Sequence, residues 1–319
     1  MSGATQTGAP AFGGEFFARY GIFLFLALLI AGGGLISPSF VSSGNINNML
    51  VQLAPLGIVV IGQAFVIISR GLDLSVASVM ATAAVMTSLY TSDNSSAPLI
   101  VASALAMALG TGLVNGLLVT KRNVSPFLAT LATAIMLQGI RFWMTSGAPS
   151  GNIPPLFKQI GAGNLGGVPI SLVIFLVIAV VFWVVLHRSA YGRALYIVGG
   201  NPIAGRLVGL SSDRVIIIAY VISSTLAATA GLILAGFAGV VDNFVGRGFE
   251  LDSIVAAVIG GVALSGGRGG IAGAVVGAAI LIAIFNLVLL IGAPVQFQII
   301  IKGAVIVLAA AFYIKKSKS

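Results

Sequence analysis

The stretch Ile271–Ile291, IAGAVVGAAILIAIFNLVLLI, decides the fold class, because it is long enough to cross a bilayer and carries no charged side chain. A transmembrane helix needs about 20 predominantly apolar residues. Similar runs fill most of the chain, and we predict ten membrane spans: Tyr20–Ile36, Val51–Ser69, Leu74–Tyr90, Ala97–Thr120, Val124–Met144, Val168–Leu186, Val215–Gly239, Ile254–Leu264, Ile271–Ile291 and Val295–Ile314. The predicted fold is therefore an all-α polytopic membrane protein.

The composition of the whole chain agrees with this fold class. Of 319 residues, 58% are hydrophobic and 7% are charged, whereas a soluble protein has roughly a quarter charged residues. The chain has no cysteine, which excludes disulfides, thiolate metal sites and cysteine nucleophiles. The single histidine, His187, lies among basic residues at a predicted helix end, so we expect it at the membrane interface. We predict no catalytic residue and no metal site.

Two of the ten segments have a second interpretation. The first apolar segment resembles a signal peptide, but its apolar stretch is long and no small-residue cleavage site follows cleanly, so we expect it to be retained. The eighth, Ile254–Leu264, rises only about 17 Å as a helix and could be one arm of a re-entrant hairpin.

The basic residues divide unevenly between the two sides of the predicted bundle. With both termini in the cytoplasm, the outside holds Arg141, Lys158 and Arg247. The cytoplasmic side holds Arg19, Arg70, Lys121, Arg122, Arg188, Arg193, Arg206, Arg214, Arg268, Lys315, Lys316 and Lys318. The positive-inside rule expects such a bias, and a re-entrant eighth segment would move the C-terminal lysines outside.

The charge bias therefore predicts a cytoplasmic tail at 1–19, a transmembrane domain at 20–314 with a cytoplasmic loop at 187–214, and a cytoplasmic tail at 315–319. Lys302 is the only charged residue expected well inside a span, and we expect it either to have a polar or backbone partner or to reach toward an interface. The excess of basic residues does not indicate nucleic acid, because no soluble basic face is predicted.

A short sequence match suggests an internal repeat. Residues 72–79, LDLSVASV, and residues 251–258, LDSIVAAV, share Leu, Asp, Val, Ala and Val in register. Five spans separate the two copies, so spans two to five and seven to ten would form inverted repeats, unless the match arose by chance. Asp73 and Asp252 each precede an apolar run, where a carboxylate can act as a helix cap; direct contact with a solute is the alternative.

The chain lacks a nucleotide-binding motif. Residues 265–270, SGGRGG, have neither the lysine nor the hydroxyl of a phosphate loop, so we expect a tight cytoplasmic turn there and no ATP hydrolysis by this chain. No series of buried acids supports coupling to an ion gradient. The chain is thus predicted not to be an enzyme.

The loop 187–214 carries helix signals of its own. Asn201 can cap a helix, Pro202 suits its first position, and Gly209 can end it, while Gly199 and Gly200 would free the backbone ahead of it. One face of this helix of about two turns would be apolar, formed by Ile203, Ala204, Leu207 and Val208. The helix either lies on lipid headgroups or docks a cytoplasmic protein.

Polar side chains on the inner spans have two interpretations as well. They either line a passage for a hydroxylated solute or hydrogen-bond between helices. The candidates are Gln63, Thr130, Thr133, Gln138 and Asn286.

The most specific motifs are Gly62–Ile68, Gly71–Val76, Ser125–Leu131, Gly192–Tyr196, Gly199–Pro202, Glu250–Asp252, Gly260–Gly261 and Leu264–Gly269. Together they resemble the permeases of ribose-, xylose- and galactoside-type ATP-binding-cassette sugar importers, over nearly all of the chain from Gly57 onward. The resemblance is looser at Gly205, Val208 and Val262, where the family usually has alanine, a small residue and threonine. The first two departures lie in the predicted short helix.

The resemblance implies a ten-helix inner-membrane permease that imports a monosaccharide or similar small polar solute. It also implies four kinds of partner: a second permease copy or paralogue, a cytoplasmic ATPase that binds ATP and Mg, a periplasmic solute-binding protein, and the lipid bilayer. The loop 187–214 would then couple to the ATPase through Arg193, Gly199, Gly200, Asn201, Pro202, Ile203, Ala204, Arg206 and Leu207. The alternative function is a stand-alone secondary carrier or facilitator, which would have the same hydropathy.

Overall fold

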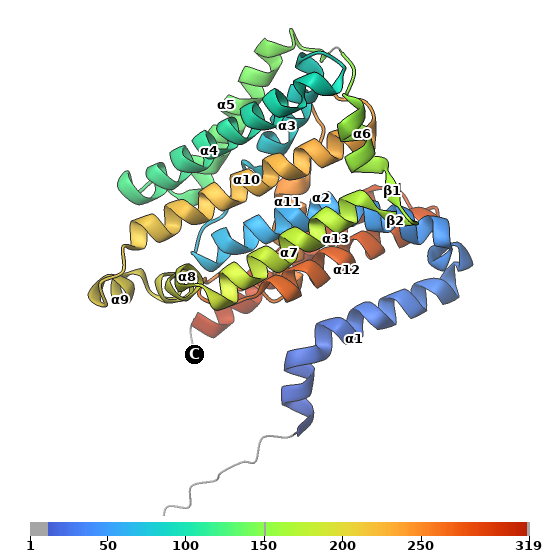
Figure 1. Cartoon of the computed structure of the whole chain (residues 1–319). Helices are drawn as coiled ribbons and strands as arrows, with labels where there is room; N and C mark the ends of the chain where they lie inside the picture. Colours follow the sequence, from blue (N-terminus) through green and yellow to red (C-terminus); the bar gives the residue numbers. More distant parts are fainter. Residues whose placement is uncertain (1–11, 150, 318–319) are drawn as a thin grey trace, which may run out of the picture.

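The computed structural model describes residues 12–149 and 151–317, with side chains described for residues 20–149 and 151–307. This part of the chain is mostly helical (Figure 1). The α-helices are α1 (Phe12–Ile36), α2 (Ser43–Ile68), α3 (Val76–Leu89), α4 (Ala97–Lys121), α5 (Pro126–Met144), α6 (Pro155–Ala162), α7 (Ile170–Arg188), α8 (Ala190–Gly200), α9 (Pro202–Leu207), α10 (Ser212–Ala238), α11 (Phe249–Ile259), α12 (Ile271–Leu290) and α13 (Gln296–Ser317). Two short 3₁₀ turns, η1 (Pro38–Val41) and η2 (Asn94–Ser96), precede α2 and α4, and an antiparallel pair, β1 (Asn164–Leu165) and β2 (Val168–Pro169), joins α6 to α7.

Every predicted span overlaps a helix, although the eighth, Ile254–Leu264, overlaps α11 only as far as Ile259. Among the described residues, six helical segments are long and apolar enough to cross a membrane: Ser43–Ile68, Asn94–Lys121, Pro126–Met144, Ile170–Arg188, Ser212–Ala238 and Ile271–Leu290. Shorter apolar helices lie at Tyr20–Ile36, Val76–Leu89 and Gln296–Val307, and α11 is 11 residues long. The chain is thus a multi-pass helical membrane protein by the length and composition of its helices.

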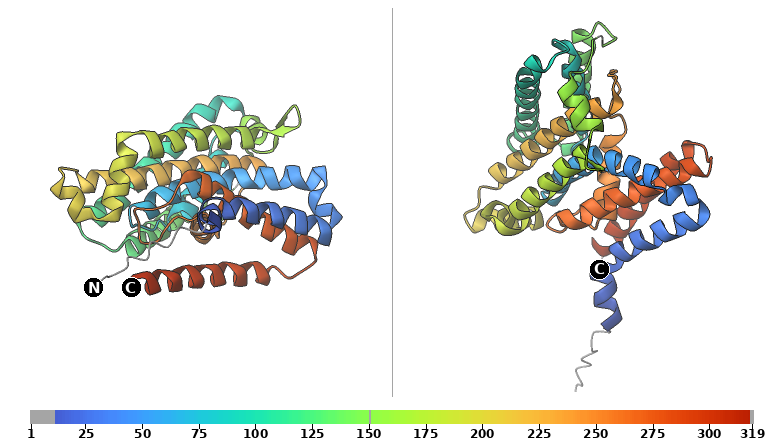
Figure 2. Two further views of the ribbon diagram at one scale, coloured as in Figure 1. Left: turned by 90° about the horizontal axis from the view of Figure 1, so that it is seen from below. Right: turned by 45° about the vertical axis from the view of Figure 1, so that its right-hand side comes forward.

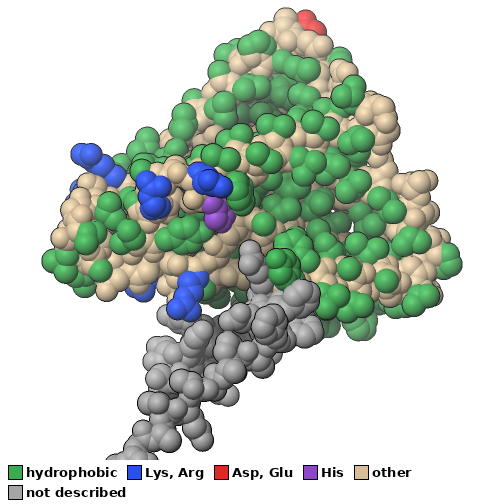
Figure 3. All heavy atoms as spheres, turned by 60° about the horizontal axis from the view of Figure 1, so that its bottom comes forward, with side chains coloured by type: hydrophobic (Ala, Val, Ile, Leu, Met, Phe, Trp, Pro, Cys, Tyr) green, Lys and Arg blue, Asp and Glu red, His purple; other side chains and the backbone are tan. Residues whose placement is uncertain are grey.

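Helices α2 and α10 form the centre of the bundle. In the most apolar stretch of α2, 89% of the residues are buried, and in that of α10 61% are. In the other four long helices a third or less of this stretch is buried. Helices α3, α4 and α5 lie on one side of α10, and α7 and α12 lie on the far side of α2 (Figures 1 and 2). The outer helices present apolar side chains outward over most of the face in Figure 3, as lipid solvation requires.

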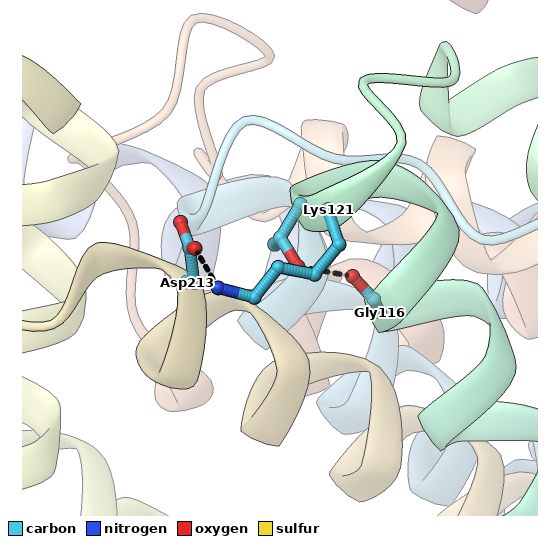
Figure 4. A network of polar contacts seen from close by, with 4 residues as sticks. Gly116, Lys121 and Asp213 are labelled. Carbon is cyan, nitrogen blue, oxygen red and sulfur yellow. Dashed lines mark hydrogen bonds and ion pairs between the residues drawn. The ribbon is translucent and has the colours of Figure 1, made fainter.

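Glycine allows two helices to approach α10 closely. A Cβ at Gly112 of α4 would lie 2.6 Å from the Cα of Val221, and one at Gly62 of α2 would lie 2.9 Å from the Cα of Ser223. Small residues of this kind drive close packing where lipid replaces water as the solvent. At the end of the α4–α10 contact, the Lys121 Nζ pairs with an Asp213 carboxylate oxygen at 2.6 Å (Figure 4).

Several connections come together at one end of the bundle. The loop after α2, the α8–α9 segment and the loop between α11 and α12 are joined there by hydrogen bonds. Most of the predicted cytoplasmic basic residues belong to these connections or to adjoining helix ends, and the basic side chains visible in Figure 3 gather toward this end. Of the remaining ones, Lys318 lies outside the described residues, as do the side chains of Arg19, Lys315 and Lys316.

The structure corrects two predictions on charged and flexible positions. Arg141, counted with the outside residues, lies inside α5 and is only 4% exposed, so Lys302 is not the only charged side chain within a predicted span. Gly199 and Gly200 do not free the backbone, because they form the last turn of α8. A Cβ at Gly199 would lie 1.8 Å from the carbonyl oxygen of Ile68, so close packing requires this glycine.

Candidate functional site

Helices α8 and α9 form a compact pair between the long helices α7 and α10. The Ser189 hydroxyl accepts a hydrogen bond from the Gly192 amide at 3.0 Å and caps α8. The Asn201 side chain accepts from the amides of Ile203 and Ala204 at 3.0 and 3.2 Å and caps α9. Local chemistry thus starts both helices, as predicted for the second.

The short helix α9 presents an apolar surface. Ile203 is 65% exposed and Leu207 83%, and Val208, which follows the helix, is also exposed. Arg206 and, on α8, Arg193 are exposed as well. Ala204 is half-buried and Gly205 is buried against α8, so only part of the predicted apolar face is free.

Arg70 joins this pair of helices to the core. Its backbone has φ +70°, a conformation rare for a residue with a side chain. Its guanidinium donates to the carbonyl of Gly200 at 2.6 Å and its Nε to the carbonyl of Ser265 at 3.0 Å. The Gly267 amide donates to the Ile68 carbonyl at 2.9 Å. We call these five residues the Arg70 junction, since they join the ends of α2 and α8 to the loop between α11 and α12.

The loop between α11 and α12 is the predicted tight turn. The amide of Gly266 donates to the Ala263 carbonyl and that of Ala263 to the Arg268 carbonyl, and both Gly266 and Gly267 have positive φ. The Tyr196 hydroxyl of α8 donates to the Gly269 carbonyl at 2.7 Å. A second bond therefore holds α8 against this loop.

A buried polar network surrounds Asp73 at the start of α3. One carboxylate oxygen accepts from the amide and hydroxyl of Ser75 at 2.9 and 2.5 Å, and the other accepts from the Ser223 hydroxyl of α10 at 2.8 Å. The network continues from Ser75 to Asn115 of α4 and then to Thr133 of α5, at 2.9 and 2.7 Å. Asp73 lies three residues before the first helical residue Val76, so it supports the turn into α3 and is not the residue at the N-cap position.

The predicted path residues separate into three groups. Gln63, Thr130 and Thr133 are buried around the Asp73 network. The Thr130 hydroxyl accepts a hydrogen bond from the Leu74 amide, and the side-chain amide of Gln63 lies where it can pair with the backbone amide and carbonyl of Asp73. Asn286 of α12 exchanges two hydrogen bonds with Asn45 of α2 at 2.8 and 2.9 Å. Thr130, Thr133 and Asn286 therefore make hydrogen bonds between elements, Gln63 does so with its amide oxygen and nitrogen exchanged, and Gln138 lines a cavity.

This cavity has a volume of about 390 Å³. Its walls come from α3, α5 and the segment 243–251 that leads into α11. The buried Arg141 joins all three walls, because its guanidinium group donates to the carbonyls of Asn243 and Ser78 and to the Thr82 hydroxyl at 3.1, 3.3 and 3.2 Å. This role was not predicted from the sequence, although a charged residue within an apolar run is a signal for it.

Asp252 is not a helix cap, which corrects the prediction. Helix α11 begins at Phe249, after Gly248 with φ +100°, so Asp252 lies within its first turns. Its carboxylate pairs with Lys302 of α13 at 2.6 Å, and the Lys302 Nζ also lies 4.7 Å from the centre of the Phe285 ring. The predicted partner for Lys302 is thereby confirmed.

Comparison with known proteins places the chain among permeases. Residues 45–310 match the family described as branched-chain amino acid transport system / permease component. The chain is 35% identical over 308 residues to the ribose import permease protein RbsC of Bacillus subtilis (strain 168), covering 94% of each chain.

Two further relatives are similar along their length. The ribose import permease protein RbsC of Escherichia coli (strain K12) is 35% identical over 295 residues, covering 91% of this chain and 92% of the relative. The galactose/methyl galactoside import permease protein MglC of the same strain is 33% identical over 310 residues, with the same two coverages. No solved structure matches the chain.

Proposed function

The chain belongs to the family of transport-system permease components, and from this premise we propose that it is the membrane-spanning permease subunit of an ATP-binding-cassette importer for a monosaccharide or similar small polar solute. The observation that carries the proposal is the similarity to ribose and galactose import permeases over more than nine-tenths of the chain. The protein is a multi-pass protein of the cell inner membrane, and its role in carbohydrate import is that of a transport subunit and not of an enzyme.

The proposed topology has ten transmembrane helices with both termini in the cytoplasm. Six long and three shorter apolar helices at the predicted places, with the 11-residue α11 near the eighth predicted span, and the grouping of basic connections at one end support it. The proposed domain is 20–314, with tails at 1–19 and 315–319. Inverted repeats of predicted spans two to five and seven to ten are part of the proposal. The short helices α3 and α11, which carry the two matching segments, support it.

The α8–α9 pair is proposed as the coupling helix region that contacts a cytoplasmic ATPase, which would bind ATP and Mg. Exposed apolar side chains of Ile203 and Leu207 beside exposed arginines suit a protein groove with an acidic rim. Further proposed partners are a second permease, as a copy or paralogue, and an extracytoplasmic solute-binding protein. Contact of α9 with lipid headgroups is the competing interpretation.

The Arg70 junction provides a route from the coupling region to the core. A displacement of α8 would act on the Gly200 carbonyl and through Arg70 on the loop before α3 and the loop after α11. A positive φ at a non-glycine residue is maintained only where the surroundings hold it, and such positions concentrate at functional sites. Arg70 thus fits a residue that transmits displacement.

The main test is Leu207→Asp in the complete importer. The added charge should prevent docking, so the chain should remain inserted while the ATPase no longer co-purifies. Leu165→Asp is the matched control, because Leu165 is 70% exposed on β1, away from α8 and α9 (Figure 1). Unchanged co-purification and unchanged uptake for Leu207→Asp would mean that α9 rests on the membrane.

A second variant separates docking from transmission. Arg70→Ala should leave the ATPase bound and hydrolysis active but reduce the uptake per ATP hydrolysed. Lys121→Ala, at the same end of the bundle, should leave the uptake per ATP unchanged. Uptake by the purified chain alone in liposomes without ATP would favour the stand-alone secondary carrier or facilitator.

A further inference from the structure

The cavity between α3, α5 and the segment 243–251 is lined by both small and polar side chains. Ala77, Ala81 and Ala134 leave the space open, and the bound guanidinium of Arg141 forms part of its fixed wall. Its volume of about 390 Å³ falls within the roughly 300–1,000 Å³ of small-molecule sites. The cavity is therefore large enough for a small solute.

Three lining side chains retain unused hydrogen-bonding capacity. Within the described part of the chain, the exposed Gln138 amide makes no hydrogen bond, and Arg247 has no carboxylate partner. The Arg247 guanidinium carbon lies 5.8 Å from the centre of the Phe244 ring. Glu250 accepts from the Gly248 amide through one oxygen at 2.8 Å, which leaves the other available. An amide, a guanidinium and a carboxylate thus surround one cavity.

This combination fits a polyhydroxylated molecule. Each sugar hydroxyl both donates and accepts, so amide, guanidinium and carboxylate groups can bind adjacent hydroxyls in pairs. Phe244, which is half exposed, offers an apolar surface to the C–H face of a sugar ring. An entirely apolar solute would leave the three polar groups without partners, which would lower its affinity.

We infer that this cavity is a sugar-binding subsite on the transport route, with Gln138, Arg247 and Glu250 as its hydrogen-bonding groups and Phe244 as its apolar wall. The inference rests on the proposed import function and extends it to particular residues. Two walls of the cavity, α3 and the start of α11, are also linked to the Arg70 junction. Arg70 lies in the connection that leads into α3, and Ser265 lies in the loop that follows α11. A displacement there would change the shape of the cavity.

The test measures uptake of radiolabelled D-ribose and D-galactose by cells with the complete importer. Arg247→Gln and Glu250→Gln should lower the kcat/KM of uptake by about tenfold, and Gln138→Leu by about fivefold, as expected for lost hydrogen bonds to a bound solute. The ratio of the two sugars should also change, and Glu250→Asp should recover part of the loss. ATPase co-purification should stay at the wild-type level for all of these variants.

Lys158→Gln and Gln159→Leu are the matched controls. Both side chains are exposed on α6 and lie outside the cavity, so uptake should stay within about twofold of the wild type. Wild-type uptake with unaltered kinetics and sugar ratio in the three cavity variants would overturn the inference and leave the proposed function intact.

Two other outcomes concern the function itself. Uptake of neither sugar by the wild-type importer, with all subunits present, would contradict the inference for these two sugars, and uptake of another monosaccharide by the same cells would leave the proposed function intact. Uptake of L-leucine that depends on Arg247 and Glu250 would instead assign the cavity to a zwitterion, and it would overturn both the inference and the proposal.

Discussion

Asp73 and Asp252 occupy matching places in two similar sequences, yet the protein satisfies their carboxylates in different ways. Asp73 lies before α3 and receives hydrogen bonds from Ser75 and Ser223, which are neutral. Asp252 lies within α11 and pairs with the cation of Lys302. In the first region the residue two positions later is Ser75, and in the second it is Ile254, which has no hydroxyl to donate.

The difference shows how the local sequence decides what the rest of the fold must supply. Where a serine lies two positions after the aspartate, that serine provides two of the three donors. Where isoleucine lies at that position, a charged partner comes from α13, 50 positions away along the chain. A buried carboxylate without a partner is costly in a membrane protein, so each region requires its own solution.

The largest effect is expected from Lys302→Met. It leaves the Asp252 carboxylate buried without its cation, and breaking such a pair should lower the free energy of unfolding by about 3 kcal/mol. The measurement is the apparent melting temperature of the purified protein in detergent, followed by tryptophan fluorescence. Adding Asp252→Asn to this variant should restore part of the stability; an equally low or lower melting temperature for the double variant would contradict the pairing account.

Asp73→Ala should have the next largest effect. The amide and hydroxyl of Ser75 and the hydroxyl of Ser223 lose their acceptor, which should cost about 2 kcal/mol in the same melting assay. Asp73→Asn keeps one acceptor oxygen and should be milder. If Asp73→Asn instead abolished uptake while the complex assembled normally, Asp73 would have a role that requires its charge.

Ser75→Ala tests the difference between the two regions directly. It removes one donor to Asp73 and the acceptor of the Asn115 amide, so a loss of about 1 kcal/mol is expected. Ser103→Ala is the control, because the Ser103 hydroxyl bonds only to a carbonyl one turn earlier in α4. Equal melting temperatures for the two variants would show that the Asp73 network adds little to stability.

Features that depend on neighbouring residues could be predicted from the sequence. The cap at Asn201 and the positive φ of Gly209 follow from residue chemistry over one or two turns, and the structure has both. The apolar spans were predicted for the same reason, since length and hydropathy are local properties. The resemblance to sugar permeases was likewise visible in short motifs.

Features that depend on packing between distant segments could not be predicted. Asp252 appeared to begin a helix, but Gly248 starts that helix earlier, and the aspartate turns toward α13. Three candidate path residues face the Asp73 network because α2, α4 and α5 meet around the start of α3. The sequence shows that these residues are polar but not which side of a helix they occupy.

The smallest effect is expected from Lys121→Met, the same substitution as at Lys302. Both lysines lie 2.6 Å from an aspartate oxygen, so distance alone predicts equal losses. The side chains of Lys121 and Asp213 are 58% and 35% exposed, against 19% and 12% for Lys302 and Asp252. Water and salt screen the exposed pair, and neither partner is left buried when the other is removed, so the loss should be below about 1 kcal/mol. The comparison is the melting temperature of the two Lys→Met variants at low and high salt. A small, salt-dependent change at Lys121 beside a larger, salt-insensitive one at Lys302 would show that burial sets the contribution of each pair, whereas equal changes would contradict that explanation.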